Sequence, residues 1–216
     1  MYSYVSQATV KPIKAKNRAA FESVQKALAA RNLRPTITFI GSGPKNLVTR
    51  WEQEPYDLDY NFVFDRLPEE FRADPRKLKD TVRAALDEAL KKEDFSYGQD
   101  STSAITYNHR TGGQLDFRLD IAILMKDEKG NYHRLIVDKH LGRCLWNEAR
   151  EMQGVTKRAR RIHEARRWND LRERYLALKN QYGKRSDVPS FSVYAEAVNL
   201  VFQSIPKEER PEEADS

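Results

Sequence analysis

The sequence predicts an α+β domain built on a mixed β-sheet, with helices on its flanks and more helices towards its C-terminal end. Three observations lead to this prediction. Residues 58–64 alternate between apolar and polar side chains, as a half-exposed strand does. Strand patterns joined by turn-rich connections follow between residues 102 and 137. Helical spacing of apolar residues flanks these strands on both sides.

The composition is that of a globular protein and excludes one embedded in a membrane. The 216 residues, 39% of them hydrophobic and 32% charged, suffice for one domain with a sizeable core. No run approaches the roughly 20 apolar residues of a spanning helix. The first residues also lack the apolar core of a signal peptide, so we expect a cytoplasmic protein. Cys144 is the single cysteine, which excludes an intrachain disulfide.

The first elements surround a glycine-containing turn. Residues 15–31 have helical spacing, and Pro35 prevents that helix from continuing. The apolar run 36–40 then predicts a short buried strand that ends at Gly41 and Ser42. We expect Pro44 to open a short helix, because proline lacks the N–H that would be unpaired at that position.

A capped helix and a pair of hairpins follow. Asp74 is the expected N-cap of a helix that begins at Pro75. Its buried stripe would consist of Leu78, Val82, Leu86 and Leu90. Strands are predicted at 102–108, 115–125 and 132–137, and the connections "RTGG" and "DEKGN" favour antiparallel hairpins.

The C-terminal part is predicted to be helical. We expect one helical stretch over 145–182 and a last helix over 189–205 with Phe191, Tyr194, Val198 and Val201 buried. The predicted domains are a core of residues 1–144, a helical region of residues 145–206 packed on it, and an acidic, disordered tail of residues 207–216.

The chemistry is expected where two strands carry acids on their polar faces. Asp57 and Asp59 share one face of the strand at 58–64, about 6.6 Å apart along it. Asp116, Arg118 and Asp120 share the polar face of the strand at 115–125. Three carboxylates at this spacing repel one another unless a cation lies among them, and Mg²⁺ or Mn²⁺ prefers such oxygen ligands. Gly41 and Ser42 can offer backbone N–H groups and a hydroxyl to a phosphate.

In these residues the sequence resembles the nucleotidyltransferase superfamily related to DNA polymerase beta. The shared features are the Gly-Ser turn, an Asp-x-Asp on a strand and a later strand-borne Asp, and the likeness spans roughly residues 15–140. The resemblance implies a mixed-sheet nucleotidyltransferase fold. It also implies metal ligands at Asp57 and Asp59, a third catalytic and metal-binding acid at Asp120, and contacts of Gly41 and Ser42 with an NTP.

Several alternatives stay open. Asp116 competes with Asp120 as the third acid, although the apolar "IAIL" after Asp120 favours the latter. A salt bridge to Arg118 or a place on the surface would account for Asp116. Asp57 and Asp59 alone would also suit a solvated edge strand. Lys45 can reach triphosphate oxygens or simply lie on the surface.

The segment 155–185 is strongly basic. It contains 11 Lys and Arg against 3 Asp and Glu, a net charge of +8 where the whole chain carries +6. Its arginines are either a solvated face of a packed helix or a polyanion-binding surface, with Arg158, Arg161 and Arg172 as candidates.

The sequence thus predicts a Mg²⁺- or Mn²⁺-dependent nucleotidyltransferase that uses an NTP. The acceptor, RNA, a protein or a small molecule, is left open. The competing class is an NTP- or RNA-binding module of the same fold without turnover. We expect a homo-oligomer or a protein partner to help recognise the acceptor.

Overall fold

The computed structural model describes residues 1–91, 93–138, 140–149, 153–184 and 187–206. They fall into two compact units, Val5–Arg150 and a second that joins Met1–Tyr4 to Glu151–Ser216. The first unit contains α1 (Gln7–Ala29), β2 (Thr36–Ile40), β3 (Thr49–Trp51), β4 (Tyr56–Phe64), α2 (Glu69–Ala73), α3 (Pro75–Leu90), β5 (Gln99–Asp100), β6 (Ile105–Thr111), β7 (Gln114–Lys126), β8 (Tyr132–Asp138) and β9 (Arg143–Glu148).

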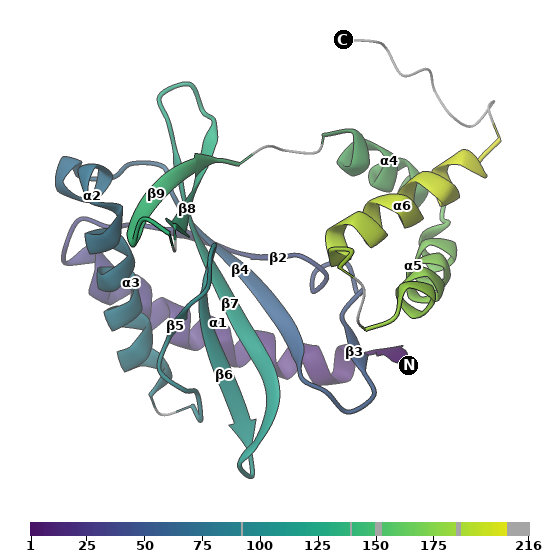
Figure 1. Cartoon of the computed structure of the whole chain (residues 1–216), viewed down its shortest axis with the longest axis horizontal. Helices are drawn as coiled ribbons and strands as arrows, with labels where there is room; N and C mark the ends of the chain where they lie inside the picture. Colours follow the sequence, from purple (N-terminus) through teal and green to yellow (C-terminus); the bar gives the residue numbers. More distant parts are fainter. Residues whose placement is uncertain (92, 139, 150–152, 185–186, 207–216) are drawn as a thin grey trace. The chain divides into compact units, whose positions relative to one another are not determined.

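The first unit is built on a sheet of seven strands. Figure 1 shows how these strands and the helices beside them are arranged. The strand order is β2-β4-β7-β6-β5, with β8 paired to the far part of β7 and β9 paired to β8. The pairing of β4 with β7 is parallel, whereas β2 with β4 and β6 with β7 are antiparallel. The predicted α+β class, mixed sheet and antiparallel hairpins are therefore confirmed.

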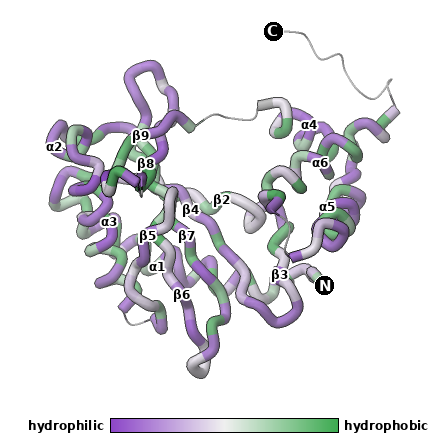
Figure 2. The backbone as a smooth tube through the Cα atoms, in the orientation of Figure 1, coloured by the Kyte–Doolittle hydropathy of each residue, from purple (hydrophilic) through white to green (hydrophobic). Residues whose placement is uncertain are grey.

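The core lies between one face of this sheet and the helices α1 and α3. The apolar residues of β4, from Leu58 to Phe64, and those of β7, from Phe117 to Ile123, face Phe21, Val24 and Leu28 of α1 in one buried cluster. Figure 2 shows hydrophobic and hydrophilic residues interleaved along these elements, as expected when each buries a single face. The opposite face of the sheet carries the polar side chains.

Local sequence explains how both helices begin. The side chain of Asp74 accepts a hydrogen bond from the Lys77 N–H, Pro75 occupies the first position of α3, and the predicted stripe is buried. Helix α1 begins at Gln7, earlier than predicted, because the hydroxyl of Ser6 caps it by accepting from the Thr9 N–H.

Three expectations in this unit are wrong. The strand at 36–40 is not buried, because β2 lies at the edge of the sheet and its residues are exposed or half-buried. Pro44 opens no helix, because the segment forms a turn in which Asn46 adopts a left-handed backbone with φ 57°. Residues 145–148 are not helical, because Arg143–Glu148 forms β9 and pairs antiparallel with β8.

The second unit consists of β1 (Tyr2–Tyr4), α4 (Gln153–Glu164), α5 (Trp168–Tyr182) and α6 (Ser190–Gln203). The basic segment therefore forms two helices, since α4 ends before Arg166, whose φ is 58°. Most apolar residues at helical spacing in this segment are buried, including Ile162, Leu171 and Tyr175, whereas Tyr182 is exposed. On α6 the prediction for Phe191 is wrong: its side chain is 48% exposed, and Val193 and Ala197 are buried instead.

The described residues include no helix that is both long enough and apolar enough to cross a membrane. The predicted acidic tail, residues 207–216, lies outside the described residues, and its disorder stays a prediction.

Candidate active site

Parallel pairing of β4 with β7 places two of the predicted acids side by side. Asp59 is the register partner of Asp120, so their Cα atoms belong to neighbouring strands about 4.8 Å apart. Asp57 precedes Asp59 by two residues on the same face and is the register partner of Arg118. The sheet thus brings Asp57, Asp59 and Asp120 to one surface, although Asp59 and Asp120 are 61 positions apart in the chain.

The glycine turn lies directly against Asp59. Ile40, the last residue of β2, is the register partner of Asp59, and Gly41 follows with φ +69°. A Cβ at Gly41 would lie 2.4 Å from Asp59 Oδ2. Any other residue would therefore suffer both the strained backbone and a steric clash with the carboxylate. Gly43 is needed for a different reason, because a Cβ there would overlap the ring of Phe39.

The turn is closed by its own backbone and by Lys45. The Leu47 N–H donates to the Ser42 carbonyl at 3.0 Å, and Lys45 Nζ donates to the Gly41 carbonyl at 2.8 Å. Burial lowers the pKa of Lys45, against the opposing effect of the Asp59 charge. The three residues predicted to bind the nucleotide, Gly41, Ser42 and Lys45, therefore form one turn beside the acids.

The acids differ in their partners. Asp57 is half exposed and pairs with Arg118, with 3.4 Å between Arg118 Nη1 and Asp57 Oδ1. Asp120 accepts a hydrogen bond from the Thr106 hydroxyl of β6. Within the described ranges, Asp59 has neither a hydrogen bond nor an ion pair.

Asp116 lies closer to the hairpin end of β7. The Thr111 hydroxyl donates to its Oδ2 at 3.4 Å, and His109 Nδ1 lies 3.9 Å from the same oxygen. Of the two alternatives for Asp116, the salt bridge to Arg118 is wrong, because that arginine pairs with Asp57 on the neighbouring strand. The Asp116 side chain is 42% exposed, as the surface alternative expects. Of the two competing acids, Asp120 is the one in register with Asp59.

Burial and repulsion by the other two acids raise the pKa of Asp59. Desolvation, then the charges of Asp120 and Asp57, raise the pKa of Asp59 to about 6, while Arg134 and Lys45 oppose the increase. Burial also raises the pKa of Asp120, against the lowering effect of the Thr106 hydrogen bond. Perturbed carboxylates of this kind are typical of functional sites.

The donor set fits a divalent cation chemically. Three carboxylates offer hard oxygen ligands, and a cation among them would relieve the repulsion that raises the pKa of Asp59. In the part of the chain that the structure describes, no group of three or more His, Cys, Asp or Glu side chains is already arranged to hold a metal ion. The predicted metal site therefore stays a prediction, carried by the shared face and by the donor chemistry.

Sequence reasoning missed three residues of this surface. Arg118 was assigned to Asp116, and Thr106 gave no signal because its partner Asp120 is known only once β6 is paired with β7. Arg134 on β8 acts electrostatically on Asp59, and its Nε is buried without a hydrogen-bond partner. Alternation of side chains within a single strand could not reveal the contact of Thr106 with Asp120 or the effect of Arg134 on Asp59.

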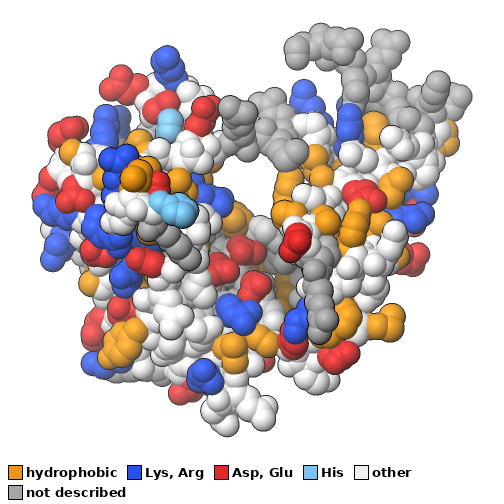
Figure 3. Space-filling model, viewed as in Figure 1, with side chains coloured by type: hydrophobic (Ala, Val, Ile, Leu, Met, Phe, Trp, Pro, Cys, Tyr) orange, Lys and Arg blue, Asp and Glu red, His pale blue; other side chains and the backbone are white. Residues whose placement is uncertain are grey.

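The candidate polyanion-binding arginines lie in the second unit, in varied surroundings. Arg158 donates to Asn199 Oδ1 at 2.8 Å and lies over the ring of Phe202. Arg172 lies over the ring of Tyr4, 4.3 Å from its centroid, and Arg161 pairs with Glu164. Figure 3 shows Lys and Arg side chains interspersed with Asp and Glu on the face drawn. The contacts of Arg158 and Arg172 are those of arginines packed on a helical unit, so they do not favour RNA as a partner.

Comparisons with known proteins find similarity in structure only. The chain matches no protein-family model and no curated protein. It is similar to the solved structure of E. coli MS115-1 CdnC with ATP, with 15% identity and a TM-score of 0.55 over 94% of this chain and 63% of CdnC. Similarity to CdnC in its complex with HORMA-deltaN is comparable, with 13% identity and a TM-score of 0.56 over 94% of this chain and 62% of CdnC.

A second protein gives a higher TM-score. Vibrio cholerae DncV, a cyclic AMP-GMP synthase solved with the linear intermediate 5′ pppA(3′,5′)pG, matches with 12% identity and a TM-score of 0.63 over 94% of this chain and 69% of DncV. The chain thus spans slightly less than two thirds of the length of CdnC and slightly more than two thirds of the length of DncV. At these identities the likeness establishes the fold, and the predicted nucleotidyltransferase fold is confirmed.

Proposed function

We propose that this chain transfers a nucleotidyl group from an NTP to an acceptor hydroxyl, with Asp57, Asp59 and Asp120 as ligands of Mg²⁺ or Mn²⁺. The observation that carries the proposal is the register of Asp59 with Asp120 directly beside Gly41. Three acids on one face of the sheet, with a glycine turn directly beside them, in a fold shared with nucleotide-bound structures, are what this reaction requires.

The residues of the chain have distinct roles in this proposal. The turn at Gly41, Ser42 and Lys45 would bind the triphosphate through backbone N–H groups, a hydroxyl and an ammonium group. Asp120, next to Asp59 on the side away from β2, would orient the acceptor hydroxyl and take its proton. A bound divalent cation would supply charge stabilisation at the phosphates and the attacking oxygen.

The acceptor that we consider first is a second nucleotide. DncV is described with an intermediate that joins two nucleotides, and CdnC is described with ATP. RNA is the weaker choice, because Arg158 and Arg172 are engaged within the second unit. CdnC is also described in complex with a HORMA protein, so the expectation of a protein partner or homo-oligomer belongs to this proposal as well.

The test is incubation of the purified chain with each of the four NTPs, labelled at the α-phosphate, singly and in pairs, with Mg²⁺ or Mn²⁺. Transfer to a nucleotide gives a new labelled product on thin-layer chromatography that resists phosphatase. Addition of cell extract reports a macromolecular acceptor as labelled protein or RNA. The Asp59→Asn variant should give none of these products, and label that stays in the NTP with every combination would contradict the proposal.

A second candidate is an NTP-binding module without turnover. It is favoured by one observation: Asp57 pairs with Arg118, with 3.4 Å between Arg118 Nη1 and Asp57 Oδ1, so this carboxylate already has a cationic partner within the protein. Calorimetry separates the candidates, because the module would bind an NTP with equal affinity in the presence of Mg²⁺ or a chelator and would release no product.

A further inference from the structure

The hydroxyl of Thr106 is the direct partner of the third acid. Thr106 on β6 is the register partner of Asp120 on β7, and its Oγ1 donates to Asp120 Oδ1 at 2.5 Å. A hydrogen bond to one carboxylate oxygen restricts rotation of the whole group and leaves the other oxygen for a second partner. Of the three acids, Asp120 alone receives a hydroxyl from a neighbouring strand among the described residues.

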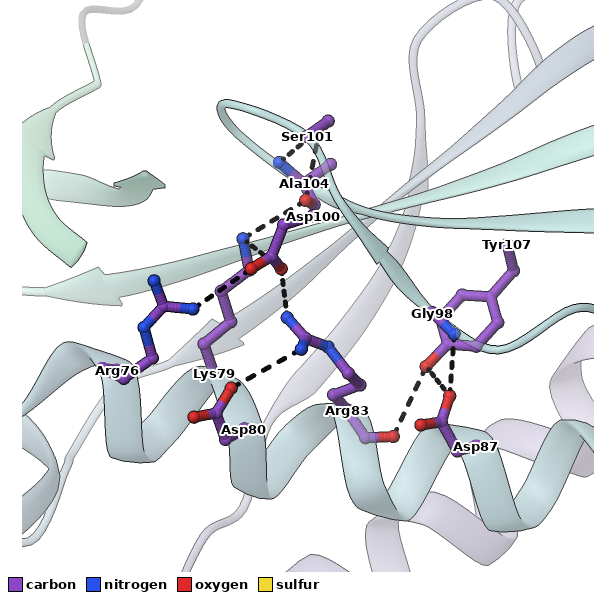
Figure 4. Close-up of polar contacts among 10 residues, drawn as sticks. All are labelled: Arg76, Lys79, Asp80, Arg83, Asp87, Gly98, Asp100, Ser101, Ala104 and Tyr107. Atoms are coloured by element: carbon purple, nitrogen blue, oxygen red, sulfur yellow. Dashed lines mark hydrogen bonds and ion pairs between the residues drawn. The ribbon is translucent and has the colours of Figure 1, made fainter. Parts of the chain in front are cut away.

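The strand that carries Thr106 is fixed from its other face. The next residue, Tyr107, is fully buried, and its hydroxyl donates to Asp87 Oδ1 of α3 at 2.8 Å (Figure 4). The same oxygen accepts from the Gly98 N–H at 2.9 Å. Side chains alternate along a strand, so contacts made by Tyr107 on the core face determine where Thr106 lies on the acid face.

A second anchor precedes Thr106 in the chain. Asp100 on β5 accepts from three cations of α3, as Figure 4 shows: Arg76, Lys79 and Arg83. Lys79 Nζ lies 3.0 Å from Asp100 Oδ1, and its side chain is only 2% exposed. A buried ammonium group needs such a partner, because an unpaired charge in the core is strongly destabilising. The contacts of Asp87 and Asp100 with their partners, here called the α3 network, thus hold the chain on both sides of Thr106.

We propose that Thr106 is a positioning residue for nucleotidyl transfer, which fixes the orientation of the Asp120 carboxylate, and that the α3 network fixes β6 for this purpose. This inference rests on the proposed function in naming Asp120 as a working acid. The same contacts would also suit a half-buried threonine with a purely structural role, so the test needs a measurement that such a role would not change.

The chain supplies a matched set of variants. Thr106→Val removes the hydroxyl and keeps the shape, and Thr106→Ser retains the hydroxyl. Thr111→Val is the control, because Thr111 lies on the same strand and donates to the competing acid Asp116 at 3.4 Å. Each variant is first checked for unaltered folding by circular dichroism and urea titration.

Kinetics with the NTP and metal that support turnover in the wild type give the first readout. We expect Thr106→Val to lower kcat roughly 10- to 100-fold, the range for loss of a hydrogen bond to a charged group. The KM for the NTP should change less than about twofold, because Thr106 does not touch the donor nucleotide. Thr106→Ser should recover most of the rate, and Thr111→Val should leave it unchanged.

Binding of Mn²⁺, followed by electron paramagnetic resonance, is the second readout. Loss of a partner that orients a metal ligand weakens metal affinity roughly 10-fold, and we expect this for Thr106→Val and not for Thr106→Ser. Wild-type kcat and Mn²⁺ affinity in Thr106→Val would overturn the inference.

Failure of the proposed function can be told apart from failure of this inference. If the wild type neither transfers nucleotide nor binds Mn²⁺, the proposed function fails. The crystal structure of Thr106→Val then tests separately whether Thr106 orients Asp120. A reoriented Asp120 carboxylate supports the positioning role, and an Asp120 that keeps its wild-type position overturns it.

Discussion

Replacing Asp59 by Asn should stabilise the chain at pH 7 while abolishing transfer. In the fold, burial and the neighbouring carboxylates raise the pKa of Asp59 from 3.8 to about 6. Each pKa unit corresponds to about 1.4 kcal/mol, so ionised Asp59 costs the folded state at most about 3 kcal/mol. Because Asp59 is partly exposed, solvent screening reduces this figure, and we expect a gain of about 1–2 kcal/mol in the free energy of unfolding.

The raised pKa also determines how the free energy of unfolding changes with pH. A carboxyl whose pKa is raised in the fold holds its proton more tightly when folded than when unfolded, so stability is lost as the pH rises from about 4 through about 6. Above that window both states are ionised and the cost is constant. The advantage of Asp59→Asn over the wild type should therefore be full at pH 7 and absent near pH 4.

The assay is urea unfolding in the presence of a metal chelator, at both pH values. Asp57→Asn is the control, because the Asp57 side chain is 53% exposed and pairs with Arg118, and its stability should stay within about 0.5 kcal/mol of the wild type. An Asp59→Asn variant that is less stable than the wild type at pH 7, or a gain of equal size at pH 4, would refute the electrostatic reasoning.

Three further predictions concern the turn, the third acid and the arginines. Gly41→Ala should destabilise the chain by about 1–3 kcal/mol, because the backbone there has a positive φ and the new Cβ would contact Asp59. The same variant should weaken NTP binding measured by calorimetry, and an unchanged affinity would show that the turn is not part of the site. Asp120→Asn should abolish turnover in a steady-state assay, and Asp116→Asn should lower turnover only slightly. If Asp116→Asn has the larger effect, Asp116 is the third acid instead of Asp120. Arg158→Gln combined with Arg172→Gln should lower the midpoint of urea unfolding, because contacts with Asn199 and Tyr4 are lost. The double variant should leave the salt dependence of RNA binding, measured by fluorescence anisotropy, unchanged. A flatter salt dependence would instead support a polyanion-binding surface that includes these arginines.

The sequence was sufficient where the information is local. Alternation from Asp57 to Phe64 predicted which side chains β4 buries, and the Asp74-Pro75 pair predicted where α3 begins. These features depend on neighbouring residues and on the periods of strands and helices. For the same reason, the face shared by Asp57 and Asp59 could be predicted.

Pairing between distant strands could not be predicted. The register of Asp59 with Asp120, and the contact of Thr106 with Asp120, depend on which strands become neighbours in the sheet. Strand β9 was mistaken for helix because its six residues run directly into a segment rich in helix formers, and its partner β8 determines its conformation. Phe191 has the helical spacing of a buried residue, yet tertiary packing leaves it exposed.

The most direct test of the central claim follows both ends of one nucleotide. ATP, or whichever NTP is active, is supplied with label at the α-phosphate in one reaction and at the γ-phosphate in the other. Nucleotidyl transfer predicts that α-label enters a new product while γ-label is released in pyrophosphate, one pyrophosphate for each nucleotidyl group transferred. Both should occur only with Mg²⁺ or Mn²⁺ and not with Asp59→Asn. Release of γ-label as inorganic phosphate with α-label left in the diphosphate, or the same products from Asp59→Asn, would contradict the account.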